Sequence, residues 1–177
     1  MTSYSSSHYV RIMAGSPFSD GPLDEIDRGI LHLYQQDART QTYAGVSERL
    51  SVSEGTVRNR LERMERQGIV ETYVPVIDYE NAGAPLRMLF TCTADVDERP
   101  DLIEPALSID GVVNVREFTA AQGNVRVVGI AADTDDISRI SSELAAIGLT
   151  VDDETLMRQE RMQPFDHFGT SALEASD

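Results

Sequence analysis

Arginine side chains are concentrated in one segment of the chain, SVSEGTVRNRLERMERQGIV, which runs from residue 51 to residue 70. The guanidinium group of arginine forms paired hydrogen bonds with phosphate and with guanine, and the amide of asparagine pairs in the same way with adenine. On a helix that turns by about 100° per residue, one sector of the segment holds no acid. Its members are Thr56, Asn59, Arg60, Arg63 and Arg66. The segment therefore predicts a surface that contacts double-stranded DNA.

The net charge of the chain would oppose such a partner, because 30 acidic against 15 basic residues give −15. The Debye length is about 8 Å at physiological ionic strength and about 3 Å at molar salt, so a phosphate beside arginines is shielded from distant acids. All the basic residues are arginine and none is lysine. A lysine-free, acid-rich composition predicts a halophilic protein, held in solution by its carboxylates, from a haloarchaeal source.

The elements around the arginine segment predict how it is positioned. A helix begins near Leu23 in LDEIDRGIL, with acids in its first turn where the helix dipole favours them. TYAGVSERL predicts a short second helix, and a third helix spans 54 to 67, with Ser53 as its cap and Gly68 at its end. Two helices joined by a short turn are typical of a helix-turn-helix. With IVETYVPVIDY as a small wing or leading strand, residues 23 to 80 are predicted to form a winged helix-turn-helix domain.

The same charges have a second interpretation. Glu54 and Arg58, and likewise Glu62 and Arg66, lie four residues apart. Such spacing is common on solvent-exposed helices that carry ion pairs and bind nothing.

The second half of the chain predicts a different architecture. After a mobile tail at 1 to 22 and a linker, NAGAP, at 81 to 85, residues 86 to 162 alternate in the order strand, helix, strand, strand, helix, strand. This order is that of a ferredoxin-like βαββαβ domain. Helices on one face of the sheet would leave the other face for a second copy of the chain, which predicts a homodimer or a higher homo-oligomer. The fold class is therefore α+β.

A C-terminal tail, residues 163 to 177, follows this domain. Its aromatic residues Phe165 and Phe168, with His167, are expected to pack onto the second domain or a partner subunit. His167 is not expected to be a metal ligand or a pH switch.

Several kinds of chemistry are not expected. Cys92 is the one cysteine, so it can form no internal disulfide or CxxC zinc site, and it is expected to be buried as a small apolar side chain. The sequence shows no nucleophile–base motif, and we expect neither a metal nor a cofactor. No stretch approaches the roughly 20 apolar residues of a membrane span. A cytoplasmic protein without membrane contact is therefore predicted.

The chain resembles the Lrp/AsnC, or feast/famine, family of transcriptional regulators over about residues 23 to 160. The resemblance is carried by LDEIDRGIL, by SVSEGTVRNRLERMERQGIV and by the βαββαβ order. It implies a sequence-specific DNA-binding regulator whose second domain dimerises and senses a small metabolite, often an amino acid. The implied DNA contacts are Ser53, Gly55, Thr56, Arg58, Asn59, Arg60 and Arg63.

The implied effector site is the turn in AQGNVRVV, with Gln122, Gly123 and Asn124. This turn departs from the family pattern, because Val125 and Arg126 stand where an aromatic and an acidic residue are usual. A different effector, or none, is therefore open, and a plain hairpin turn is the competing interpretation.

Two other functions remain open at this stage. Tetrapyrrole-decarboxylating enzymes share a similar two-domain architecture, but their chemistry needs converging histidine, tyrosine or arginine side chains in a large pocket. The second alternative is a module that binds a metabolite or a protein partner and does not bind DNA.

Overall fold

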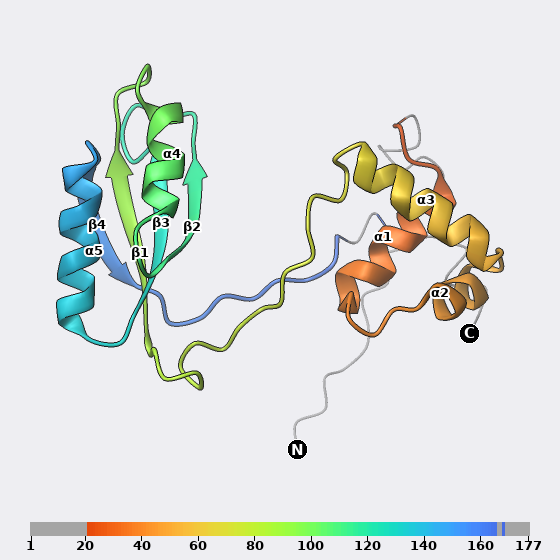
Figure 1. Ribbon diagram of the computed structural model, residues 1–177. Coiled ribbons are helices and arrows are strands. Elements are labelled where there is room, and N and C mark those ends of the chain that lie inside the picture. The colour runs from red at the N-terminus through yellow and green to blue at the C-terminus, as the bar shows by residue number, and fades with distance from the viewer. Residues whose placement is uncertain (1–20, 166–167, 169–177) are drawn as a thin grey trace, which may run out of the picture. The chain divides into compact units, whose positions relative to one another are not determined.

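The structure, a computed structural model, describes residues 21 to 165 and residue 168 (Figure 1). The described chain forms two compact units. One comprises the residues up to Val74 and those from Met162 onward, and the other is Pro75–Arg161. No helix in the described ranges is long and apolar enough to cross a membrane. Residues 1 to 20, with most of the predicted N-terminal tail, lie outside the described residues, as does His167.

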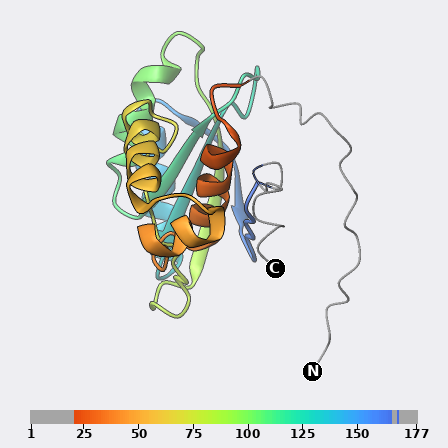
Figure 2. The ribbon, with the colours of Figure 1, turned by 90° about the vertical axis from the view of Figure 1, so that its right-hand side faces the viewer.

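The first unit contains the three helices that the sequence predicts. They are α1 (Glu25–Asp37), α2 (Tyr43–Leu50) and α3 (Glu54–Arg66), and Figure 2 shows them from a second direction. Their apolar faces meet in one core formed by Ile30, Leu31, Leu33, Val46, Leu50, Val57, Leu61 and Met64. The predicted stripe of α3, with one apolar residue at each turn, is thus buried. The polar side chains of α3 lie on its other side, where residues of adjacent elements can contact them.

Side-chain caps begin each of these helices. Asp24 and Asp27 form a reciprocal capping box at the start of α1, and Thr42 caps α2. Ser53 caps α3 as predicted, because its Oγ accepts a hydrogen bond of 3.0 Å from the Thr56 amide. Gly68 follows α3 with a positive φ of 68°, the conformation expected of a glycine that ends a helix.

The predicted wing does not form a strand. Residues 71 to 78 have no regular secondary structure, and Tyr73, Val74, Val76 and Ile77 are exposed. Pro75 lies at the centre of this segment and cannot donate a backbone hydrogen bond, which disfavours strand pairing there.

The C-terminal segment packs where the sequence did not predict. Phe168 packs against the helix core of the first unit, and its ring meets that of Phe165 edge-on at 5.0 Å between centroids. The backbone amide of Phe165 donates to the side chain of Gln35 in α1. The expectation of packing onto the second domain is therefore wrong for Phe168, which packs on the helical unit.

The second unit is a four-stranded antiparallel sheet with two helices. Its elements are β1 (Leu86–Thr93), α4 (Arg99–Leu107), β2 (Val112–Glu117), β3 (Val125–Ala131), α5 (Thr134–Ala146) and β4 (Thr150–Leu156). The strand order β2-β3-β1-β4 with this chain order confirms the ferredoxin-like βαββαβ fold. Both helices contribute to a core that includes Phe90, Cys92, Val125, Val127, Ala106, Ile140 and Leu144. Both therefore cover the same face of the sheet.

One local expectation for this unit is confirmed. Cys92 is fully buried, as expected, and burial raises the pKa of its thiol to about 12. Asp133 caps α5, because its carboxylate accepts hydrogen bonds from two backbone amides. Leu107 is exposed in the last turn of α4, next to the buried Ala106.

Candidate nucleic-acid interface

The exposed surface of α3 begins at its N-terminus. Ser53, Gly55, Arg58 and Asn59 are exposed, and Thr56 is half-buried with its hydroxyl 2.8 Å from that of Ser53. The guanidinium of Arg58 lies over the ring of Tyr43 in α2, 5.2 Å from the ring centroid. A helix N-terminus presents backbone amides, which favour phosphate, beside side chains that can reach base edges. Four of the seven predicted DNA-contacting residues are therefore exposed in the N-terminal half of α3, and Thr56 is half-buried beside them.

The other two predicted contacts, Arg60 and Arg63, are engaged inside the first unit. Arg60 forms ion pairs with Asp24 and, at 3.0 Å, with Asp27, and Arg63 forms an ion pair with the second oxygen of Asp27. Asp27 is only 1% exposed. Its carboxylate needs these partners, because an unpaired charge in the interior is strongly unfavourable. The structure thus separates Arg60 and Arg63 from the exposed surface on which the sequence grouped them.

The sector with Arg60 and Arg63 has no acid on its own helix, but α1 brings Asp24 and Asp27 to it. Both acids stand in LDEIDRGIL, so the signal for these ion pairs is present in the sequence but lies on another helix. Burial alone would raise the pKa of Asp24, but its hydrogen bonds to Arg60 and to the Asp27 amide outweigh burial and lower that pKa overall.

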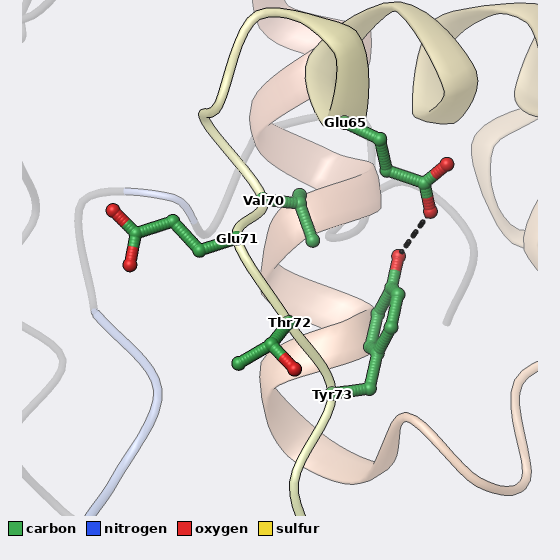
Figure 3. A pocket seen from close by; sticks show the side chains of 5 residues that line it. All are labelled: Glu65, Val70, Glu71, Thr72 and Tyr73. Carbon is green, nitrogen blue, oxygen red and sulfur yellow. Dashed lines mark hydrogen bonds between the residues drawn. The ribbon is translucent and has the colours of Figure 1, made fainter. Parts of the chain in front are cut away.

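Shallow hollows flank a hydrogen-bonded pair at the end of α3. Figure 3 shows the Tyr73 hydroxyl donating to the Glu65 carboxylate at 3.0 Å, with Val70, Glu71 and Thr72 around them. A second hollow on the other side of this pair is lined by Tyr34, Tyr43 and further residues of the three helices. Burial raises the pKa of Tyr73, and the bond to Glu65 raises it further, so the hydroxyl stays protonated. Neither hollow is lined by a histidine or a cysteine.

The predicted effector turn joins β2 to β3. Gln122 is exposed, while Gly123 adopts a positive φ of 58° and donates its amide to the hydroxyl of Thr93 at 2.8 Å. Asn124 is fully buried, and its amide group exchanges two hydrogen bonds, of 2.9 and 2.8 Å, with the backbone of Ala94. Asn124 therefore holds the turn against the end of β1, and its amide is not presented to a ligand as the sequence suggested.

The sheet face opposite the helices carries both arginines and acids. One row across the four strands consists of Arg116, Arg126, Thr91 and Asp153, which are paired in register. Glu160 forms ion pairs with Arg87 and, at 3.7 Å, with Arg116. In this row, the arginines therefore lie on β2 and β3 and the acid lies on β4.

No group of three or more metal-ligating side chains occurs among the residues that the structure describes. His32 lies on α1 with its Nε2 3.1 Å from the amide nitrogen of Gln36.

A helical unit with an exposed recognition helix, joined to a ferredoxin-like sheet, defines a two-domain DNA-binding protein. The comparisons agree. Residues 23–71 match a family model described as winged helix-turn-helix DNA-binding. The chain is 33% identical over 123 residues to the HTH-type transcriptional regulator LrpA of Pyrococcus horikoshii, covering 68% of this chain and 84% of that protein. It belongs to the Lrp/AsnC family of transcriptional regulators.

A second relative and two solved structures extend the comparison. An uncharacterised HTH-type regulator of Pyrococcus abyssi is 36% identical over 115 residues, which are 65% of this chain and 64% of that one, so the chain spans less than two thirds of it. AsnC of E. coli has a TM-score of 0.64 at 19% identity, with 82% of this chain and 98% of that chain covered. A regulator of Neisseria meningitidis, solved with L-Met, has a TM-score of 0.65 at 21% identity, with 80% and 94% covered. These two likenesses show the fold.

Proposed function

We propose that this protein regulates transcription by binding specific sites in double-stranded DNA through the N-terminal half of α3. The observation that carries the proposal is the exposure of Arg58 and Asn59 beside the α3 N-terminus, in a chain of this family. Ser53, Gly55 and Thr56 would meet phosphates, while Arg58 and Asn59 would read bases, since arginine favours guanine and asparagine favours adenine. In this proposal the protein acts in the cytoplasm, where the DNA lies. It is proposed to be a regulator and not an enzyme.

The test is selection of binding sites from a random DNA library, followed by gel shifts on the selected site. The double variant Arg58→Ala, Asn59→Ala should bind at least about tenfold more weakly than the parent. Arg66→Ala is the matched control, because Arg66 is exposed on the same helix but lies at its far end, 3.9 Å from Glu62. Equal affinity of the double variant and the parent would show that another surface reads the DNA.

We also propose that the open sheet face joins two copies of the chain. Both copies would present this same face, and a two-fold axis parallel to the strands would place Arg116 on β2 of each copy opposite the β4 strand, with its Asp153, of the other. Leu89 and Ile130 on this face are only half-buried. Leu89→Asp should convert the dimer to a monomer in sedimentation, whereas Val96→Asp, at an exposed site outside the sheet, should not.

An amino acid or a related metabolite is the effector that we propose for the β2–β3 turn. The L-Met complex of the Neisseria meningitidis regulator supports a small-molecule ligand, and the exposed Gln122 is the side chain offered here. Gly123 and Asn124 would fix the shape of the turn. Thermal shifts with each of the twenty amino acids test the proposal. A ligand that raises Tm equally in the parent and in Gln122→Ala would bind elsewhere.

The relatives named above come from Pyrococcus, so they do not support a haloarchaeal source. Adaptation of the protein to concentrated salt is a separate proposal. It rests on the lysine-free, acid-rich composition. Tm should rise steadily with potassium chloride from dilute buffer to molar concentrations. A constant Tm across this series would refute it.

A further inference from the structure

We propose that Asp27 is a positioning residue for DNA recognition, which fixes α3 through Arg60 and Arg63, and that these two arginines bind Asp27 rather than DNA phosphates. This inference rests on the proposed DNA contacts of Arg58 and Asn59. In this proposal α1 makes no contact with bases. It controls the orientation of α3, the recognition helix.

The geometry joins α1 and α3 at two points. Asp27 Oδ1 accepts from Arg60 at 3.0 Å, and Oδ2 accepts from Arg63 and, at 3.1 Å, from the backbone amide of Asp24. Arg60 and Arg63 are three residues apart, so their guanidinium groups reach α1 from successive turns of α3. Two fixed points on successive turns restrain both the distance of α3 from α1 and its rotation about its own axis.

Burial keeps the arginines on Asp27. The side chain of Asp27 is 1% exposed, whereas those of Arg60 and Arg63 are 24% and 39% exposed. Transfer of either arginine to a DNA phosphate would leave part of a buried carboxylate unpaired, and a buried charge without its partner is strongly unfavourable. The arginine would exchange its ion pair with the buried Asp27 for an ion pair with a phosphate that is exposed to water and salt.

Charge balance supports the same assignment. Two guanidinium groups, of Arg60 and Arg63, meet two carboxylates, of Asp24 and Asp27, so this cluster carries no net charge. A neutral cluster does not attract the DNA backbone over distance. Arg58 has no acid partner among the ion pairs of the described residues, and its nearest assigned contact is the ring of Tyr43.

Small rotations of α3 matter because Arg58 and Asn59 immediately precede Arg60. Side chains lie about 5–6 Å from the axis of a helix. A rotation of about 20° would move them by about 2 Å, and productive geometry at a site is held within about 0.5 Å and 10–20°. Loss of the Asp27 restraint should therefore weaken the reading of bases without removing a contact to phosphate.

The experiment measures affinity for the selected DNA site as a function of salt, in the full chain. Asp27→Asn retains an amide oxygen that can accept the Asp24 amide, so it preserves the capping box while removing the charge. We expect about a tenfold loss of affinity for the selected site, with a slope of log affinity against log salt equal to that of the parent. Arg58→Gln is the control for a direct contact. It should relax base preference at one position, as expected for a lost base contact.

Arg63→Gln keeps the proposal testable if Asp27→Asn does not fold. It should leave the salt slope unchanged while lowering affinity for the selected site more than affinity for unrelated DNA. A slope reduced by about 1 in Arg63→Gln would overturn the proposal, because it would identify Arg63 as a phosphate contact. Unchanged or increased affinity in a folded Asp27→Asn would also overturn it. If the parent itself showed no preference for any DNA site, the proposed function would fail instead, a result distinct from both.

Discussion

Two polar side chains are buried in the part of the chain that the structure describes, and each unit has one. Asp27 in the helical unit is charged and is held by the guanidinium groups of α3. Asn124 in the sheet unit is neutral and is held by the backbone of Ala94. Asp27 connects the candidate DNA-binding helix to its unit through ion pairs. Asn124 connects the candidate effector turn to its unit through neutral hydrogen bonds.

The difference shows what each anchor can restrain. Asp27 holds the charged side chains of another helix, so it joins one helix to another through ion pairs. Asn124 holds a main-chain amide and carbonyl, so it fixes a turn whatever the neighbouring side chains are. The helical anchor should therefore respond to removal of charge, and the sheet anchor should respond only to loss of its hydrogen bonds.

Removal of the charged anchor should have the largest effect. Asp27→Ala loses the ion pairs and half of the capping box, and we expect the free energy of unfolding to fall by about 4 kcal/mol. Urea unfolding followed by circular dichroism measures this change. A loss below about 1 kcal/mol would mean that hydration stabilises the guanidinium groups of Arg60 and Arg63 about as well as their ion pairs with Asp27 do.

Removal of the neutral anchor should cost somewhat less. Asn124→Leu is close in volume but leaves the amide and carbonyl of Ala94 without their partners, which should cost about 3 kcal/mol. The same unfolding measurement applies, with Gln122→Ala as the control in the same turn. That control is exposed and should lie within about 0.5 kcal/mol of the parent. Comparable losses in both variants would remove the distinction between a buried anchor and an exposed turn residue.

Acid should weaken the contacts of Asp24, the partner of Asp27 in the capping box and of Arg60 in an ion pair. The folded-state pKa of Asp24 lies below its ordinary value of 3.8, so the Asp24 charge stabilises the fold above that pH, and the stabilisation is lost as pH falls through the folded pKa. Asp24→Ser retains a capping oxygen without the charge. The stability difference between parent and Asp24→Ser should be constant above about pH 5 and shrink below about pH 4. A difference that persists at pH 2 would point to packing instead of charge.

The smallest effect on stability should come from the exposed ion pair of α3. Arg66 lies 3.9 Å from Glu62, and its side chain is 69% exposed. Arg66→Ala should change the free energy of unfolding by less than about 0.5 kcal/mol, as is usual for exposed ion pairs. Arg63→Ala, one turn earlier, should cost more because Asp27 is buried. Equal costs for the two substitutions would contradict the assignment of Arg63 as an anchor.

Local signals in the sequence were sufficient for much of the fold. Apolar spacing located α3 and its buried Val57, Leu61 and Met64, and a serine before the helix identified its cap. Strand alternation and turn residues gave the βαββαβ order. Each of these features depends on residues within a few positions of one another, so a single sequence contains them.

The surroundings of the candidate site could be predicted only in part. Exposure of Asn59 follows from its position opposite the apolar stripe of α3, and Arg58 lies at the side of that stripe. The partners of Arg60 and Arg63 could not be inferred in that way, because Asp27 lies 33 residues before Arg60. For the same reason, the pairing of Asn124 with Ala94, 30 residues away, was not foreseen.

The sequence by itself determined the order of the helices and strands in the two units, the buried stripe of α3, and which family the chain resembles. The tertiary structure alone decided which arginines of α3 stay exposed, whether Asn124 faces solvent or backbone, and that Phe168 packs on the helical unit. The physical reason is that periodicity identifies a buried face but not the element that covers it. A charge on a half-buried face takes its role from that covering element.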